Sequence, residues 1–115
     1  MKRDIDLIKL LLREVEGEEP KPDLNIYSQE QVLYHYELME EAGLVVADFV
    51  RGSSGEVVGA RIERLTNSGH DFLDASRSDK VWSKFKLAVG KVGGSISIPV
   101  AFELMKQLVK KEFGL

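Results

Sequence analysis

The chain has 115 residues, with 16 Lys and Arg against 19 Asp and Glu, and a formal net charge of −3. Its length predicts one domain over residues 1–115, built around a single hydrophobic core. The absence of cysteine excludes disulfides and thiolate zinc sites, and the absence of an apolar run of about 18 residues excludes a membrane-spanning helix. We therefore expect a cytoplasmic protein that does not contact a membrane.

Charge is divided unevenly along the chain. Residues 1–76 have 8 basic and 16 acidic side chains, whereas residues 77–115 have 8 basic and 3 acidic ones. The first part therefore carries a net charge of −8 and the second a net charge of +5. A strongly basic domain, which is the usual mark of a DNA-binding protein, is absent. Any binding to nucleic acid would have to use a local basic patch.

The first 26 residues predict a helix, a loop and a short strand. Apolar side chains in residues 4–16 recur over about half of a helical circumference, so we expect other helices to enclose this one. Gly17, Pro20 and Pro22 then predict a loop, because proline lacks an amide proton and restricts the residue before it. Residues 24–26 can form the short first strand that many winged-helix domains have.

Residues 28–42 carry the clearest helix signals. Ser28 can cap the start of this central helix, and Gly43 can take the left-handed conformation that ends it. Val32, Tyr36 and Met39 recur at helical spacing and predict a buried edge. The opposite face is acidic, because residues 28–42 contain four glutamates and neither Lys nor Arg.

A β-hairpin is predicted directly after the central helix. Residues 45–50 and 56–65 read as strands, and the segment between them contains two glycines that suit a hairpin loop. A helix that leads straight into a hairpin is typical of the recognition helix and wing of winged-helix repressors. The predicted fold is therefore α+β and mostly helical: a winged helix, made of two helices and a hairpin wing, with additional C-terminal helices.

Three helices are predicted after the hairpin. The first is capped by Thr66 or Asn67, the second occupies residues 77–92, and Gly93 and Gly94 break the chain before the third, over residues 97–113. Apolar side chains cover more than half of the circumference of this last helix. So wide an apolar surface is difficult to bury within one small domain, and we therefore expect a homodimer that forms through this helix.

Several separated motifs resemble one protein family. The chain opens with Met-Lys-Arg-Asp, residues 34–44 read Tyr-His-Tyr-Glu-Leu-Met-Glu-Glu-Ala-Gly-Leu, residues 65–74 read Leu-Thr-Asn-Ser-Gly-His-Asp-Phe-Leu-Asp, and residues 79–82 read Asp-Lys-Val-Trp. In these motifs the chain resembles a family of small bacterial and phage-carried proteins of unknown function. The resemblance implies a winged-helix-like fold and no particular activity, ligand or catalytic residue.

A more distant similarity concerns residues 28–45. They resemble the recognition helix of metal-responsive and similar small repressors, with a Ser-x-x-x-Val-x-x-x-Leu-x-x-Leu-x-x-Ala-Gly-Leu-Val pattern in which Tyr36 replaces the usual leucine. Those repressors place a full helix before the turn, whereas this chain has only residues 20–26 there. The difference argues against standard helix-turn-helix docking on DNA.

Double-stranded DNA is nevertheless one predicted partner of a regulatory or phage-linked accessory protein. The candidate contacts are polar or basic side chains on the central helix, on the wing, and on a stripe of the helix over residues 77–92. They are Gln29, Gln31 and Tyr34, then Arg51, Arg61 and Arg64, then Arg77, Lys80, Lys84 and Lys91. The alternative is that the stripe is a solvated helix face, and the glutamates of the central helix would oppose a polyanion.

The rival prediction is a protein-interaction module without DNA binding. Here the acidic central helix, with Leu33, Tyr34 and Leu38 exposed, meets a basic protein partner. Both predictions are non-enzymatic and require no cofactor or metal. His35 and His70 lack a metal-ligand spacing and are expected to be hydrogen-bonded structural residues.

Overall fold

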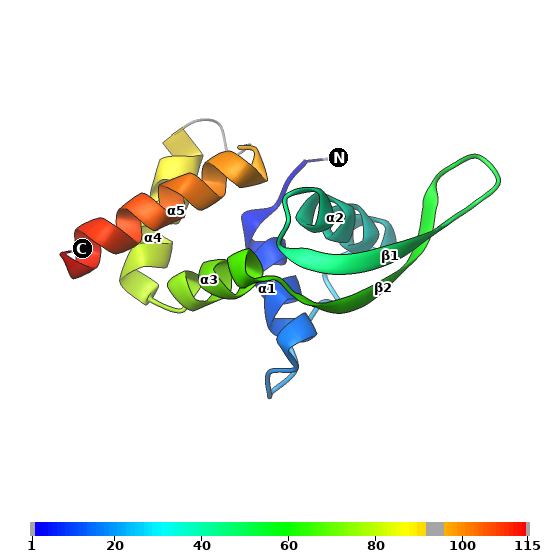
Figure 1. Ribbon diagram of the computed structural model, residues 1–115, viewed down its shortest axis with the longest axis horizontal. Helices are drawn as coiled ribbons and strands as arrows, with labels where there is room; N and C mark the ends of the chain where they lie inside the picture. The colour runs from blue at the N-terminus through cyan, green and yellow to red at the C-terminus, as the bar shows by residue number, and fades with distance from the viewer. Residues whose placement is uncertain (1, 92–95, 115) are drawn as a thin grey trace.

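The computed structural model describes residues 2–91 and 96–114, which form five helices and one antiparallel two-stranded sheet (Figure 1). In chain order these elements are α1 (Ile5–Glu16), α2 (Gln29–Glu41), β1 (Val45–Arg51), β2 (Val57–Leu65), α3 (Asn67–Ser76), α4 (Asp79–Lys91) and α5 (Ile98–Phe113). The prediction of an α+β, mostly helical chain is confirmed. The predicted break at residues 93–95, and Val92 before it, lie outside the described residues.

Helix α1 joins two halves of the fold. Figure 1 shows α1 in the middle of the molecule, with α2 and the hairpin on one side and α3, α4 and α5 on the other. α1 contacts α2, β2 and α3. Its buried side chains are the apolar ones that the sequence pattern predicted, with the exception of the half-buried Val15: Ile5, Leu7, Ile8, Leu11 and Leu12. The long axis of the molecule measures 50 Å.

The predicted strand at residues 24–26 is wrong. These residues form a turn, in which the Tyr27 amide donates to the Leu24 carbonyl at 3.0 Å and the Asn25 amide donates to the Asp23 carboxylate at 2.9 Å. Ile26 is 81% exposed. A side-chain acceptor two residues before an amide is the usual Asx-turn arrangement, and it outweighs the weak strand preference of so short a segment.

Both ends of α2 are fixed as predicted. Ser28 accepts a hydrogen bond from the Gln31 amide while the Gln31 side chain accepts one from the Ser28 amide, which is a complete capping box. Gly43 has φ 76°, and the amides of Gly43 and Leu44 donate back to the carbonyls of Glu40 and Met39. This Schellman arrangement turns the chain directly into β1. Of the predicted buried edge, Tyr36 and Met39 are buried, and Val32 is half-buried against the core.

A tight corner connects the start of β1 to the start of α3. The Thr66 amide donates to the Leu44 carbonyl at 3.0 Å, and the Thr66 hydroxyl donates to the Gly43 carbonyl and accepts from the Gly69 amide. A Cβ on Gly69 would lie 2.1 Å from the Leu44 oxygen, so only glycine fits there. Phe72 on the same helix is buried and makes an edge contact with Phe85 of α4. Residues of the 65–74 motif therefore have structural roles in this chain.

The hairpin extends away from the helices (Figure 1). Val45 pairs with Leu65 at its base, where both side chains are buried, and Phe49 pairs with Ala60 farther out. The register shifts between Val46 and Ala47 and again between Val50 and Arg51. Irregularities of this kind increase strand twist. The base of the hairpin thus belongs to the core, and its distal part is available for contacts with other molecules.

Candidate interaction site

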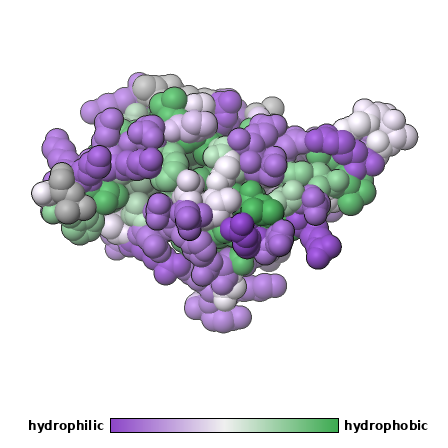
Figure 2. Space-filling model, in the orientation of Figure 1, coloured by the Kyte–Doolittle hydropathy of each residue, from purple (hydrophilic) through white to green (hydrophobic). Residues whose placement is uncertain are grey.

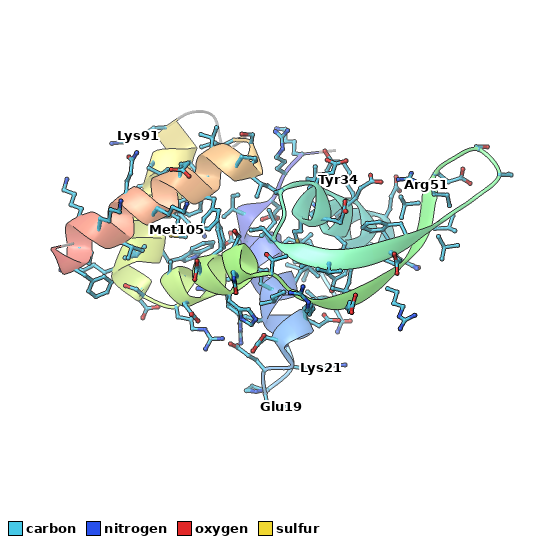
Figure 3. The ribbon with its side chains drawn as sticks, in the orientation of Figure 1. Glu19, Lys21, Tyr34, Arg51, Lys91 and Met105 are labelled. Carbon is cyan, nitrogen blue, oxygen red and sulfur yellow. The ribbon has the colours of Figure 1, made fainter. Side chains whose placement is uncertain are left out.

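A cleft lies between α2 and the distal part of the hairpin. It encloses about 280 Å³ and is lined by Glu30, Leu33, Tyr34, Glu37, Arg51, Gly55, Glu56 and Val57. Figure 3 shows Tyr34 on α2 and Arg51 on the hairpin, at the two sides of this region. The α2 residues lie at spacings of three and four, so they share one helix face. The capping box and the Gly43 turn fix the direction of that face relative to the hairpin.

The charge in this cleft is mainly negative. Three carboxylates and one guanidinium line it, and the guanidinium of Arg51 already donates to Glu37 Oε2 at 3.0 Å and to the Gly55 carbonyl at 3.0 Å. Glu30 and Glu56 are both exposed at its edge. The Arg51–Glu37 pair connects the hairpin to α2, and the remaining acids leave the cleft with a net negative charge.

Leu33 and Tyr34, which were predicted to be exposed on the acidic central helix, line the cleft and are half-buried instead. Leu38, predicted to belong to the same surface, packs against the core and lines a different, smaller cleft with Arg3 and Pro99. The prediction of an exposed Leu38 is therefore wrong. Residue 38 is rotated by about 100° from Glu37 around α2, which moves it toward the C-terminal half of the molecule.

The other polar residues predicted to contact DNA from α2 and β2 lie on the surface. Gln29 is exposed, whereas the Gln31 side chain is engaged in the capping box. Arg61 and Arg64 are exposed on β2; Arg61 pairs in register with Asp48, and Arg64 donates to the Leu65 carbonyl at 3.1 Å. These arginines lie outside the lining of the acidic cleft.

The predicted basic stripe of α4 is divided in space. Lys80 and Lys84 both contact Glu112 of α5, each at 3.0 Å, and the hydrogen bonds from Lys84 and Lys80 hold the pKa of Glu112 below its ordinary value. Arg77 turns instead toward Glu18, in the loop after α1. Lys91 is exposed at the end of α4 (Figure 3). Three of the four stripe cations thus serve contacts within the chain.

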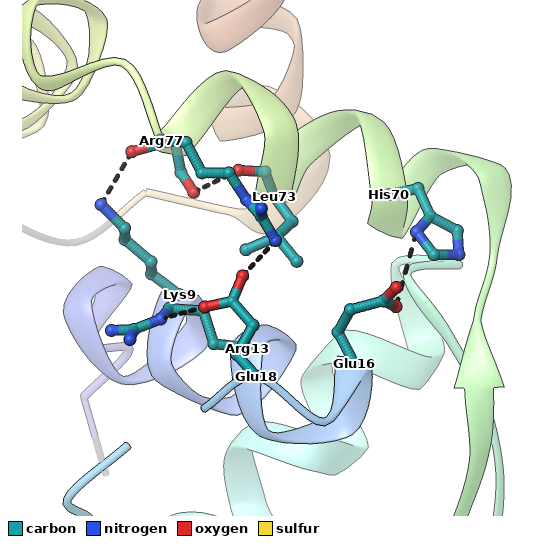
Figure 4. A network of polar contacts seen from close by, with 8 residues as sticks. Lys9, Arg13, Glu16, Glu18, His70, Leu73 and Arg77 are labelled. Carbon is teal, nitrogen blue, oxygen red and sulfur yellow. Dashed lines mark hydrogen bonds and ion pairs between the residues drawn. The ribbon is translucent and has the colours of Figure 1, made fainter. Parts of the chain in front are cut away.

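Glu18 is the centre of a polar network between α1 and α3 (Figure 4). Its carboxylate accepts from Arg13 at 2.7 Å and from Arg77. Lys9 donates to the Ser76 carbonyl at 2.7 Å and lies 4.6 Å from the centre of the Trp82 ring. Burial, with Arg13 nearby, holds the pKa of Lys9 below its ordinary value. This network fastens the C-terminal half of the fold to α1.

Glu18→Gln is expected to lower the free energy of unfolding by about 0.5–1 kcal/mol at neutral pH. The hydrogen bond from Arg13, with Arg77 adding to it, holds the pKa of the Glu18 carboxyl below its ordinary value. The stabilisation is therefore present above the ordinary carboxyl range and is lost as pH falls through the lowered pKa. Urea denaturation of both proteins at about pH 7 and about pH 2 measures the difference, which should vanish in acid.

The matched control for that experiment is Glu19→Gln. Glu19 is exposed beside Glu18, and no ion pair involves it among the described residues. We expect its replacement to leave stability nearly unchanged at either pH. An equal loss of unfolding free energy in the two variants would show that the overall charge of the chain, rather than the contacts of Glu18 with the arginines, causes the effect.

Neither histidine belongs to a metal site in the described part of the chain. Residues 2–91 and 96–114 contain no group of three or more His, Asp or Glu side chains that could hold a metal ion. His35 is fully buried; its Nε2 accepts from the Asp4 amide at 2.8 Å, and its Nδ1 donates to the Gln31 carbonyl at 2.8 Å. His70 is half exposed, with Nδ1 3.7 Å from Glu16. The structural role predicted for His35 is confirmed.

Sequence reasoning missed the tertiary ion pairs. Glu37 and Arg51 are 14 positions apart, and Lys84 and Glu112 are 28 apart. Helical and strand periodicities relate neighbours a few residues apart, so no spacing signal links these pairs. The acidity of residues 28–42 was the available signal, and it correctly marked the character of the cleft.

Fold and surface together define a small, mostly helical α+β protein with a hairpin, an acidic cleft and, within the described residues, no helix long and apolar enough to cross a membrane. The chain belongs to the family described as "Hypothetical protein (DUF2513)", whose model matches residues 2–95. It is 31% identical over 116 residues to a protein of Haemophilus influenzae named "Uncharacterized protein", covering 96% of this chain and 93% of that one. No solved structure gives a significant match. The predicted membership of a small family without an assigned function is confirmed.

Proposed function

We propose that the protein is a non-enzymatic interaction module that binds a cationic segment of a partner protein in the cleft between α2 and the hairpin. The observation that carries this proposal is the charge of the cleft: Glu30, Glu37 and Glu56 face a single arginine, which is already paired. A Lys- or Arg-bearing segment would gain favourable contacts with the two remaining carboxylates. Electrostatic complementarity of this kind gives both specificity and rapid association.

The shape of the cleft supports the same proposal. Leu33, Tyr34 and Val57 supply half-buried apolar surface between the acidic side chains. Tyrosine is enriched at protein interfaces because it offers a large apolar body and a hydroxyl group. We therefore infer a partner segment with an apolar side chain between its basic residues, rather than a polymer that carries charge alone.

The scaffold of this module is proposed to be winged-helix-like. α2 leads directly into the hairpin, and α1 packs against both α2 and β2. In this arrangement the hairpin takes the place of the wing, and α2 takes the place of the recognition helix. The acidic face of α2 would then recognise a basic protein instead of a DNA groove.

Binding to double-stranded DNA in a regulatory or phage-linked role is the second candidate. It is favoured by two observations: Arg61 and Arg64 are exposed on β2, and residues 77–115 carry a net charge of +5. The wing would then lie along the phosphate backbone while Lys91 and neighbouring cations contact it from α4. The acidic α2 and the contacts of Lys80 and Lys84 with Glu112 argue against this candidate.

The test compares two peptide probes and one DNA probe by fluorescence anisotropy with the full chain. One peptide alternates lysine with leucine, the second has glutamate in place of lysine, and the DNA is a random-sequence duplex. We expect the lysine peptide to bind and the glutamate peptide not to bind. Glu30→Lys combined with Glu56→Lys should weaken binding by at least about tenfold, because two attractive contacts become repulsive.

The matched control is Glu40→Lys combined with Glu63→Lys. It changes the net charge by the same amount at exposed positions outside the cleft. An equal loss of binding in the two double variants would disprove the site. If instead the duplex binds, and Arg61→Glu with Arg64→Glu abolishes that binding, the DNA candidate is the correct one.

A further inference from the structure

A second groove lies between α3 and α5, in the half of the molecule away from the hairpin. It encloses about 450 Å³. Its floor is apolar and consists of Ala75 with Phe102, Met105 and Val109, and Phe113 stands at one end with 61% of its surface exposed. Met105, labelled in Figure 3, is the fully buried residue of this floor. Figure 2 shows apolar surface between polar side chains near the C-terminal end of the molecule.

The two sides of this groove carry opposite charges. Asp71 and Asp74 form the side that belongs to α3, and Lys106 and Lys110 form the side that belongs to α5. Each pair lies three or four residues apart, so each lies on one face of its helix. All four residues are exposed. Lys106 also lies over the Phe102 ring at 4.7 Å and 3.3 Å from Glu103.

We infer that this groove is the interface of a homodimer with a two-fold axis running along the groove. A two-fold axis in that direction places the acidic side of one copy opposite the basic side of the other, and it does so twice. It also makes the apolar floor of one copy face that of the other. An isologous contact requires such a self-complementary surface, and the opposed charged sides supply it.

The same charge pattern selects a second copy over other occupants. A basic or an acidic peptide would satisfy one side of the groove and be repelled by the other. A surface that carries a row of acidic and a row of basic side chains at the same separation satisfies both sides. A second copy of this chain has such a surface. With the axis along the groove, the two α5 helices run parallel to each other. An axis across the groove would instead place the acidic side of one copy opposite the acidic side of the other.

This inference is independent of the proposed cleft. Figure 1 shows α5 and the hairpin toward opposite ends of the molecule. The two sites have no lining residue in common. Loss of the dimer would therefore leave the cleft intact, and failure of the peptide test would not affect the dimer.

The test is the mass of the full chain in solution, measured by light scattering after size exclusion, in two oppositely charged variants. Lys106→Glu with Lys110→Glu makes both sides acidic, and Asp71→Lys with Asp74→Lys makes both sides basic. We expect the unmodified chain to be a dimer. Each variant alone should dissociate at least about tenfold more readily, because like charges then meet across the two-fold axis. Mixing the two variants should restore a dimer, since every contact is again between opposite charges.

The control variant is Lys91→Glu with Lys111→Glu. It changes the net charge by the same amount as Lys106→Glu with Lys110→Glu, but at exposed positions outside the groove, and should leave the dimer unchanged. Circular dichroism on each variant verifies that the fold is retained. A monomeric unmodified chain overturns the inference. So does a charge-reversed variant that dimerises as strongly as the control, or a mixture of the two variants that stays monomeric.

Discussion

Gly69→Ala is expected to lower the free energy of unfolding by roughly 3 kcal/mol, a large share of the stability of a small domain. The added Cβ would lie 2.1 Å from the Leu44 oxygen and 3.1 Å from the Leu44 carbonyl carbon. Leu44 cannot retreat freely, because its oxygen accepts the Thr66 amide and its side chain is fully buried. α3 would have to move away from the base of the hairpin.

Gly90→Ala is the matched control. Gly90 is also helical and exposed, and beyond the backbone of its own helix no atom of the described residues lies within 4 Å of the position that a Cβ would take. Alanine should therefore stabilise α4 by about 0.5–1 kcal/mol, through its better helix propensity. Urea denaturation followed by circular dichroism measures both variants. If Gly69→Ala is as stable as the unmodified chain, the close approach at the corner does not constrain the fold.

The sequence predicted helix ends well because the signals are local. Ser28 and Thr66 accept hydrogen bonds from amides three residues ahead, and Gly43 takes the left-handed conformation that ends α2. The residues in each of these contacts are only a few positions apart, so local side-chain chemistry determines where the helix begins or ends. The prediction that a hairpin directly follows α2 rests on the same local signals.

The sequence predicted surfaces less well because they depend on tertiary contacts. Lys80 and Lys84 were expected to form a free basic stripe, but both meet Glu112, which reaches them from α5. Leu38 was expected to be exposed, but it packs on the core. In each case, an element distant in sequence changed the environment of a residue whose helical position was predicted correctly.

The acidic cleft could be predicted from the sequence only in part, because one of its sides follows from local composition and the other from tertiary contacts. The glutamates of α2 were evident from composition, whereas Glu56 and Val57 enter the cleft because both strands of the hairpin run alongside α2. The ion pair between Arg51 and Glu37 keeps the hairpin close to α2. The position of the hairpin thus decides whether α2 presents an isolated acidic face or one side of a cleft.

His35→Ala is expected to lower the free energy of unfolding by about 3 kcal/mol, from a lost hydrogen bond and a buried cavity together. A backbone amide can only donate, so Nε2 accepts from Asp4 and the proton of the ring lies on Nδ1, which donates to the Gln31 carbonyl. Asp4 in turn caps α1 through the Leu7 amide. The buried ring thus connects the start of α1 to α2, and alanine would leave the Asp4 amide without its partner.

His70→Ala provides the comparison, because His70 is half exposed and the one ion pair of its side chain among the described residues, with Glu16, is 3.7 Å long. Its removal should change stability by no more than about 0.5 kcal/mol. Amide hydrogen exchange distinguishes the mechanism: in His35→Ala the amides at the start of α1 should exchange faster, while those at the base of the hairpin keep their relative protection. Equal stability of the two alanine variants would mean that the apolar packing of α1, and not the buried histidine, fixes its position against α2.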